Sequence, residues 1–249
     1  MDFRIDGRKN NQLRPIDVEL GFIDNPIGSV LYKQGRTWVL AAMDVVEGVP
    51  NHVKGSGHGW LSAEYALLPP STRPRSPREA RSGRQAGRTV EIQRIIGRAL
   101  RSVVDLYSVG EHTIVLDCDI LQADGGTRTA SITASCLAMA QGCHRLMVEE
   151  GWVRNPLKDF LVGVSVGSIQ GELLLDLNYT EDSMAQVDLN LGMTSKGELV
   201  EIQGTGEGRP FPITELDKLL ELARKGADDT VAICREILEG ENITLPVLV

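Results

Sequence analysis

Three groups of residues in this 249-residue chain have the side chains that phosphate chemistry requires. The first is the segment 73–101, which contains nine arginines, no lysine and only two acids, Glu79 and Glu91. The planar guanidinium group of arginine binds phosphate through two parallel hydrogen bonds, whereas lysine offers only a point charge. A solvated basic loop that pairs with acids elsewhere on the surface is the alternative, but the exclusive use of arginine favours phosphate recognition.

The second group is a glycine-rich sequence, within residues 122–129, that leads from a predicted strand into a predicted helix. Its members are Gly125, Gly126, Thr127 and Arg128. Glycine lets the backbone approach an anion closely, and the free N–H groups at a helix N-terminus attract negative charge. The Gly-x-x-x-x-Gly-Lys-Ser/Thr signature of a Walker loop is missing. An ordinary tight turn before a helix is an equally good interpretation of this pattern alone.

The third group is a set of carboxylates in the second half of the chain: Asp176, Glu181, Asp182 and Asp188. Alternation along a predicted strand places Asp188 and Asn190 on one face, opposite two leucines. Acids held away from bulk water need a divalent cation or an arginine partner. Taken alone, an exposed loop acid and an edge-strand acid are the simpler interpretation. Together, however, the three groups suggest an enzyme that acts on a phosphodiester chain with inorganic phosphate nearby.

Composition narrows the class of protein. The formal net charge is −8, so the arginine segment is a local basic feature of an acidic chain. This suits a focused site for a polyanion better than a general coat for nucleic acid. The four cysteines show no Cys-x-x-Cys pairing, which argues against a zinc knuckle or a disulfide framework. The Gly-x-Ser-x-Gly sequence at residues 163–167 lies inside a predicted strand and not at the strand-to-helix turn of a nucleophile elbow, which argues against a serine hydrolase.

The start of the chain, residues 1–4, is polar, and no long apolar run follows it. We therefore expect no signal peptide and no membrane span, and we predict a cytoplasmic location.

Periodicity predicts the elements that position these groups. Strands are expected at residues 18–23, 29–33, 37–45, 60–68, 112–121, 160–169, 173–177, 186–193 and 199–203. Helices are expected at residues 89–105, 130–150 and 214–238, the last with Thr214 and Asp217 as a capping pair. Residues 71–87, rich in proline and glycine, are expected to form a mobile, exposed loop. Strands followed by helices, twice over, predict an internally duplicated β-β-α arrangement of α+β class. Without a linker, residues 1–249 are expected to be one catalytic domain.

Ordered motifs over nearly the whole chain carry a family resemblance. They are Asp6-Gly7-Arg8, Gly57-His58-Gly59-Trp60, Ala63-Glu64-Tyr65, Gly87-Arg88-Thr89, residues 122–131, Glu181-Asp182-Ser183, Asp188-Leu189-Asn190 and residues 200–205. On these motifs the sequence resembles the RNase PH family of phosphate-dependent exoribonucleases, whose activity is also called tRNA nucleotidyltransferase. The resemblance implies a two-layer fold of ribosomal-protein-S5-domain-2-like type and a homohexameric ring built as a trimer of dimers.

The resemblance also implies a role for each group. Inorganic phosphate, the co-substrate, would be bound by Arg88, Gly126, Thr127 and Arg128. Asp182 and Asp188 would assist catalysis and bind Mg²⁺ or another divalent metal. Arg75 and Arg78 match loop arginines that guide RNA in the family.

The sequence departs from the family pattern at two places. The family often has Pro-Arg-Ser-Thr where this chain has Pro-Pro-Ser-Thr at residues 69–72, so one RNA-contacting arginine is missing, and Arg73 is the candidate replacement. Asn178 stands where an aspartate is common. These departures concern the affinity for RNA more than the chemistry.

The function expected from the sequence is 3′-to-5′ trimming of precursor tRNA and other RNA 3′ ends. Phosphate attacks the last phosphodiester bond and releases a nucleoside diphosphate, and the reverse reaction adds nucleotides. The first alternative is a catalytic ring subunit of an exosome-like complex, which works only beside an inactive subunit. The second is a non-catalytic ring protein that threads RNA, and such a protein should have lost the phosphate-binding triplet or the aspartates.

Overall fold

The computed structural model describes residues 4–243, apart from the side chain of Ser82. Residues 1–3, which belong to the polar start noted above, and residues 244–249 lie outside the described residues, and so do both ends of the predicted 1–249 domain. Among the described residues, no helix combines the length and the apolar character needed to cross a membrane.

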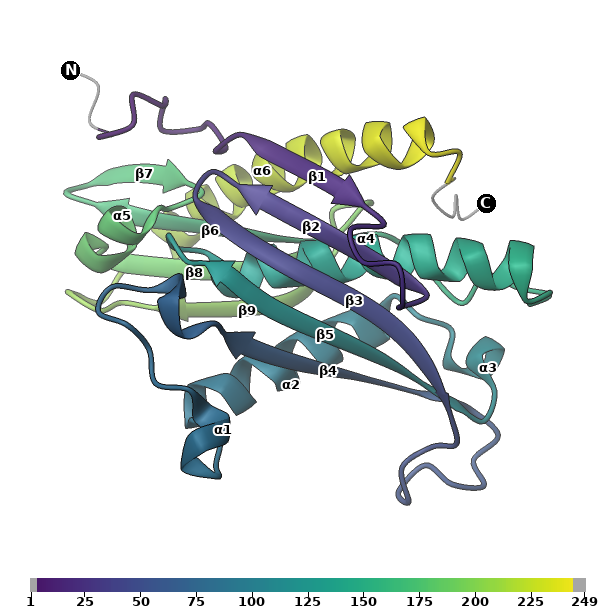
Figure 1. The fold of residues 1–249 in the computed structure, drawn as a ribbon. Coiled ribbons are helices and arrows are strands. Elements are labelled where there is room, and N and C mark those ends of the chain that lie inside the picture. The colour runs from purple at the N-terminus through teal and green to yellow at the C-terminus, as the bar shows by residue number, and fades with distance from the viewer. Residues whose placement is uncertain (1–3, 244–249) are drawn as a thin grey trace.

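Nine strands form two sheets within the described part of the chain (Figure 1). The first sheet has the order β1 (Ile16–Leu20), β2 (Gly28–Gln34), β3 (Thr37–Glu47), β5 (His112–Gln122) and β4 (Trp60–Leu67). Its strands are antiparallel except for β4, which runs parallel to β5. The second sheet is antiparallel, with the order β7 (Glu172–Leu175), β6 (Leu161–Ile169), β8 (Val187–Thr194) and β9 (Leu199–Thr205).

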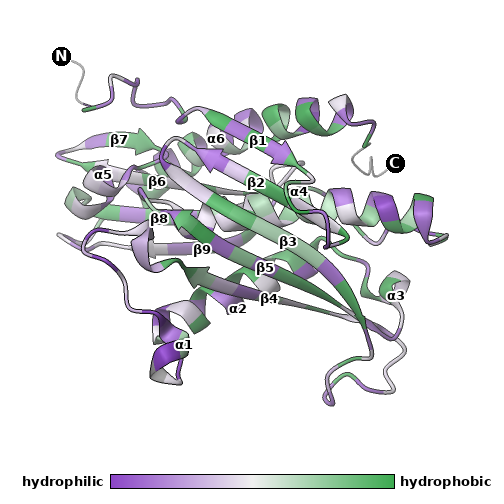
Figure 2. Ribbon diagram, in the orientation of Figure 1, coloured by the Kyte–Doolittle hydropathy of each residue, from purple (hydrophilic) through white to green (hydrophobic). Residues whose placement is uncertain are grey.

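Three long helices accompany the sheets: α2 (Gly87–Ser102), α4 (Thr127–Glu149) and α6 (Ile213–Gly240). Four shorter ones are η1 (Pro69–Ser71), α1 (Glu79–Ser82), α3 (Leu106–Val109) and α5 (Tyr179–Met184). All nine predicted strands and all three predicted helices are present, with ends shifted by up to three residues. Burial alternates along β3 as period-two patterning requires, although Figure 2 and the sequence show apolar residues at consecutive positions of that strand.

Helix α4 is the centre of the molecule. It contacts β2 and β3 of the first sheet and β6 of the second, and every residue from Thr129 to Cys143 is buried. The approach of β6 is close, because a Cβ atom on Gly163 would lie 2.2 Å from the carbonyl oxygen of Thr129. A single cluster of buried apolar side chains includes residues of both sheets. The N-terminus of α4 is therefore held in a fixed position relative to both sheets.

Helix α2 joins the edges of the two sheets. It packs against β4, the edge strand of the first sheet, and against β9, the edge strand of the second. Its outer face pairs Arg98 with Glu201 of β9 at 2.9 Å. The first turn of α2, which carries Arg88, consequently lies beside the N-terminus of α4, with which α2 also packs.

A buried ion network connects the N-terminal segment to the second half of the chain. Arg4 pairs with Glu181 at 2.7 Å and Arg14 pairs with Asp176 at 2.6 Å, and all four side chains are almost fully buried. Arg8 contributes contacts to both acids at 3.5 Å. Burial opposes ionisation of Asp176, but the charge and hydrogen bonds of Arg14 outweigh it and hold the pKa of Asp176 below its ordinary value.

Three sequence-based expectations were wrong. The four predicted carboxylates do not form one cluster, because Asp176 and Glu181 are partners of buried arginines. Thr214 and Asp217 do not cap α6, since the helix starts at Ile213 after Pro212, and its N-cap has no side-chain hydrogen bond. Residues 71–87 are not loop throughout: η1 ends at Ser71, and the short helix α1 is tied to α2 by a 2.6 Å hydrogen bond from Thr89 to Glu79.

The network makes a prediction about stability. Asp176→Asn keeps the shape of the side chain but removes the counter-charge of Arg14, so the free energy of unfolding should fall by about 3–5 kcal/mol. The stabilisation of Asp176 is present above its ordinary pKa of 3.8 and is lost as the pH falls through its lower folded-state pKa. The acid limb of the stability profile should therefore be shallower in the variant. Chemical denaturation at several pH values measures both effects.

The matched control is Asp228→Asn, which breaks the half-exposed pair with Arg224 on α6. Its unfolding free energy should change by less than about 0.5 kcal/mol. If the two variants lost similar stability, the buried network would not have the role assigned to it.

Candidate active site

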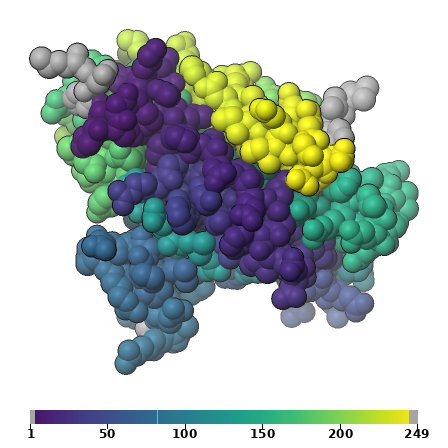
Figure 3. Space-filling view, turned by 45° about the horizontal axis from the view of Figure 1, so that its top comes forward, coloured from purple at the N-terminus to yellow at the C-terminus, as the bar shows by residue number. Residues whose placement is uncertain are grey.

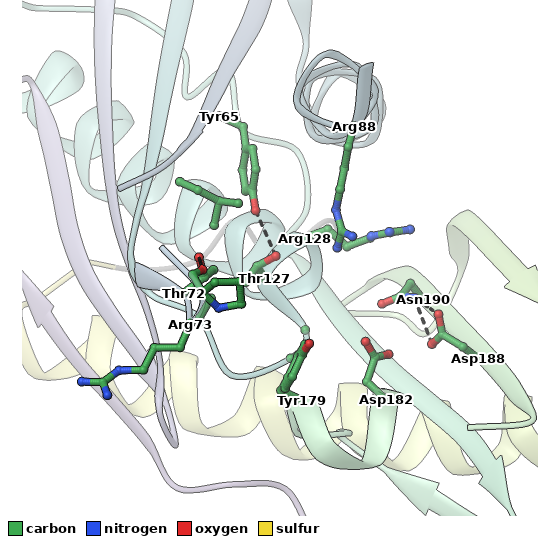
Figure 4. A pocket seen from close by; sticks show the side chains of 15 residues that line it. Tyr65, Thr72, Arg73, Arg88, Thr127, Arg128, Tyr179, Asp182, Asp188 and Asn190 are labelled. Carbon is green, nitrogen blue, oxygen red and sulfur yellow. Dashed lines mark hydrogen bonds between the residues drawn. The ribbon is translucent and has the colours of Figure 1, made fainter. Parts of the chain in front are cut away.

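A pocket of about 350 Å³ lies at the N-terminus of α4 (Figure 4). Most of the predicted site residues line it: Arg73, Arg88, Gly126, Thr127, Arg128, Asp182 and Asp188. They come from α2, the start of α4, α5, β8 and the segment after β4. Arg75 and Arg78 are exposed and are not part of its lining. The fold thus brings the arginine segment, the glycine-rich sequence and two of the carboxylates to one place.

The glycine-rich sequence is shaped to let α5 approach. Gly125 and Gly126 have φ angles of 76° and 64°, and Gly126 is the N-cap of α4. A Cβ atom on Gly125 would lie 2.6 Å from the backbone carbon of Asn178, the residue that caps α5. Any larger residue at 125 would therefore push α5, and with it Asp182, away from the pocket.

Thr37 fixes this glycine-rich sequence to the first sheet. Its Oγ1 donates to the carbonyl oxygen of Gly125 at 2.7 Å and accepts from the amide of Asp124 at 3.0 Å. Arg14, from the buried network, donates to the carbonyl oxygen of Asp124 at 2.6 Å. The backbone before Thr127 and Arg128 is thereby positioned both by Thr37, at the start of β3, and by Arg14 of the buried ion network.

The positive side of the pocket contains Arg88 and Arg128, whose side chains approach each other in Figure 4. Arg128 donates to the side-chain oxygen of Gln203 on β9, which orients the guanidinium group. Tyr65 donates to Thr127 Oγ1 at 3.0 Å, and burial raises the pKa of Tyr65, so the phenol stays protonated as the donor. Since this bond uses an acceptor position of Thr127, its own hydroxyl proton is free to bind an anion.

The negative side of the pocket contains Asp182 and Asp188. Burial and the charge of Asp182 raise the pKa of Asp188 to about 6, although Arg128 and a hydrogen bond from Asn190 act in the opposite direction. Asn190 Nδ2 lies 3.1 and 3.0 Å from the two carboxylate oxygens of Asp188. Burial also raises the pKa of Asp182, against the charges of Arg128 and Arg88. Burial thus disfavours the ionised form of both acids by more than the neighbouring arginines favour it.

This carboxylate pair fits a hard divalent cation. Mg²⁺ prefers oxygen ligands and is commonly bound by one or two carboxylates together with substrate phosphates and water. In residues 4–243, no group of three or more histidine, cysteine or acidic residues is arranged to hold a metal on its own. Asp182 and Asp188 would thus bind a cation together with a phosphate ligand, not as a closed protein site.

Several pocket residues were not predicted from the sequence. The signal for Tyr65 was its place in a motif. Its position on the same buried face of β4 as Ala63 is equally typical of a core residue. Thr72 and Tyr179 also line the pocket, and Tyr179 begins α5, an element that was not predicted. Gln203 accepts a hydrogen bond from Arg128, and its signals in the sequence were its place on β9 and in the motif at residues 200–205.

The geometry predicts that the pocket binds inorganic phosphate without any other ligand. Arg88→Ala and Arg128→Ala should each weaken phosphate binding about tenfold or more, because each removes a charged hydrogen-bond donor. Arg94→Ala, an exposed position on the same helix as Arg88, is the control and should leave the affinity unchanged. Isothermal titration calorimetry makes the measurement. Equal affinities for Arg128→Ala and the control would remove Arg128 from the anion site.

Comparisons with known proteins agree with this architecture. The fold is similar to rice (Oryza sativa) Rrp46, with 21% identity, a TM-score of 0.77 and coverage of 94% of this chain and 100% of that one. It is also similar to an Archaeoglobus fulgidus exosome structure with RNA bound to the active site, with 23% identity, a TM-score of 0.76 and coverage of 96% and 92%. A third similar structure is an archaeal exosome core, with 23% identity, a TM-score of 0.70 and coverage of 91% and 90%. These likenesses confirm the expected α+β fold of ribosomal-protein-S5-domain-2-like type.

Two family models match this chain and assign it to a protein family. The model for domain 1 of the 3′ exoribonuclease family matches residues 12–142, and the model for domain 2 matches residues 159–226. The first region contains Arg88, Thr127 and Arg128, and the second contains Asp182 and Asp188, so the pocket is built from both. The chain therefore belongs to the RNase PH-type 3′ exoribonuclease family.

Proposed function

We propose that this protein is a phosphate-dependent 3′-to-5′ exoribonuclease that works as a catalytic subunit of a ring. One observation carries the proposal: an anion-binding group and a carboxylate pair face each other in a single pocket. Arg88, Thr127 and Arg128 are the anion-binding side, and Asp182 and Asp188 are the carboxylate side. A phosphodiester that enters between them lies next to a bound phosphate, which is the arrangement that phosphorolysis needs.

In this proposal, phosphate itself is the nucleophile. No histidine or cysteine among the described residues lines the pocket, so its known lining offers neither an imidazole base nor a thiolate. The two arginines hold the attacking phosphate and reduce the repulsion between it and the RNA phosphate. The carboxylates would hold Mg²⁺, which supplies neutralisation of the negative charge on the transferring phosphoryl group. The products are a nucleoside diphosphate and an RNA shortened by one residue.

The ring in which this chain works could be of exosome type or a homohexamer. The solved structures described above are an Rrp46, an exosome with RNA bound to the active site and an archaeal exosome core, and they favour an exosome-type ring subunit over a homohexamer dedicated to tRNA. Both sides of the pocket are complete in this chain, which argues against a ring protein without catalysis. Trimming of precursor tRNA, the homohexamer, the divalent metal and the cytoplasmic location stay predictions from the sequence.

The proposed reaction predicts both the co-substrate and the products of trimming. Trimming of an oligoribonucleotide should require inorganic phosphate and should release nucleoside diphosphates, because the pocket supplies an anion site and not a protein nucleophile. Thin-layer or liquid chromatography of the products measures this. Nucleoside monophosphates formed in phosphate-free buffer would indicate hydrolysis and overturn the proposal.

The same preparation distinguishes the assemblies. The purified single chain should be measured for mass by light scattering and for trimming activity in one experiment. An active hexamer of this chain alone would favour the homohexameric ring. A chain that trims RNA only after a second ring subunit is added would favour the exosome-type ring.

The carboxylates make a second prediction, with two readouts. Asp182→Asn and Asp188→Asn should each lower trimming by about a hundredfold at saturating phosphate. Since the folded protein raises the pKa of Asp188 to about 6, its ionised form is less favourable in the folded than in the unfolded chain at pH 7. The free energy of unfolding should therefore not fall in Asp188→Asn. Wild-type activity in either variant would show that this acid is not needed for catalysis.

A further inference from the structure

A second pocket, also of about 350 Å³, adjoins the active-site pocket. The two share four lining residues: Thr72, Arg73, Ala123 and Tyr179. Figure 4 shows the Arg73 side chain pointing away from Arg88, so its guanidinium group is directed out of the phosphate-binding side. An extended ligand that leaves the active-site pocket past Tyr179 therefore meets the second pocket directly.

The second pocket is lined by two arginines, Arg36 and Arg73, and by one acid, Asp124. Across residues 4–243, neither arginine takes part in an ion pair. Asp124 Oδ1 accepts a hydrogen bond from the amide of Tyr179 at 3.4 Å, and its charge also acts on Arg14. The pocket thus offers two cations without acidic partners to an anionic ligand.

Arg36 is held in a fixed place relative to the active site. It lies in the two-residue turn between β2 and β3, where Gln34 pairs with Thr37. Gln122 Nε2 donates to the carbonyl oxygen of Arg36 at 2.8 Å, and Thr37 is bonded to the glycine-rich sequence at Gly125. Because the backbone is fixed on both sides, only the Arg36 side chain has to be ordered when a ligand binds.

Two further groups suit an RNA strand. The Ser71 side chain is buried, lines this pocket, and its Oγ has no hydrogen-bond partner among the described residues. A buried hydroxyl without a partner costs free energy, and a rotation of the Ser71 side chain toward the pocket would let a ligand oxygen satisfy it. Tyr179, at the boundary of the two pockets, is 61% exposed, and an exposed aromatic ring is a platform on which a base can stack.

We propose that the second pocket binds a phosphodiester group of the RNA upstream of the bond that is cleaved. Arg36 and Arg73 are its cations, and Ser71 is its neutral donor. This subsite rests on the proposed function, since it presumes that the ligand of the active-site pocket is an RNA 3′ end. Arg36 would then raise affinity for RNA without reading the bases, and it would not touch the attacking phosphate.

The test uses oligoribonucleotides in which one linkage at a time is replaced by an uncharged methylphosphonate. Binding to the whole protein is measured by fluorescence anisotropy in phosphate-free buffer, so that no phosphorolysis occurs. At one upstream position the replacement should weaken binding to the wild type by about tenfold. Arg36→Ala should bind the unmodified strand about tenfold more weakly and should respond less to that replacement than the wild type does, because Arg73 remains.

Salt dependence gives an independent readout. Each phosphate contact on a single strand contributes about 0.7 to the slope of log affinity against log salt concentration, so Arg36→Ala should lower the slope by about this amount. Arg36→Lys should keep most of it. Arg154→Ala is the charge-matched control, because it follows the C-terminus of α4, roughly 33 Å along that helix from the pocket, and it is exposed.

Equal affinities and equal slopes for Arg36→Ala and Arg154→Ala would overturn the subsite, and so would an unchanged response of Arg36→Ala to every methylphosphonate. A separate assay with phosphate keeps the two proposals apart. Release of nucleoside diphosphate without any effect of Arg36 would overturn only the subsite. A linkage effect that depends on Arg36, in a protein that releases no nucleoside diphosphate, would support the subsite and overturn the proposed reaction.

Discussion

The buried pairing of Arg4 with Glu181 and of Arg14 with Asp176 is the interaction on which the rest of the structure depends. Glu181 also forms the capping box of α5. Its carboxylate accepts a hydrogen bond from the backbone amide of Asn178 at 3.0 Å, and its backbone amide donates to the side-chain oxygen of Asn178. The residue that holds the N-terminal segment thus also starts the short helix that carries Asp182. Charges removed from water need excellent partners, and here each of the two acids has more than one.

The active-site pocket follows from this constraint and from the central position of α4. The first half of the chain supplies the arginines and the glycine-rich helix start, and the second half supplies the carboxylates. Neither sheet alone could place cations and acids on opposite sides of one space. The burial that raises the pKa of Asp188 also makes the field of the partly buried Arg128 stronger than it would be in water. In Figure 3, the purple N-terminal part of the described chain lies beside the yellow helix α6.

The elements could be predicted from the sequence because periodicity is a local signal, whereas the roles of the pocket residues followed from the family resemblance. Arg88, Thr127 and Arg128 each stand at a helix start, and Asp188 shows its face by alternation with Leu189. The buried ion pairs could not be predicted in this way, since Arg4 and Glu181 are 177 positions apart and only the tertiary fold brings them together. The four acids were therefore grouped together in the sequence, although Asp176 and Glu181 are partners of buried arginines.

Other differences have equally local causes. Helix α1 has only four residues, too few to show a period, and it lies in a segment rich in proline and glycine. Pro212 fixes its own φ angle and precedes α6, so the helix begins before the Thr214 that resembled a cap. The sequence predicts Tyr65 to be a core residue, and its side chain is indeed buried. Only its hydroxyl group reaches the pocket, where it bonds to Thr127.

The raised pKa of the Asp182 and Asp188 pair has a consequence for how such proteins diverge. The two acids are held ionised at a cost in folding free energy, while the core and the buried network do not use them. A copy of the gene that lost either acid would lose the proposed chemistry but keep the fold. Drift after duplication would then lead readily from an active subunit to an inert paralogue that still holds RNA, and selection for turnover alone would preserve the pair.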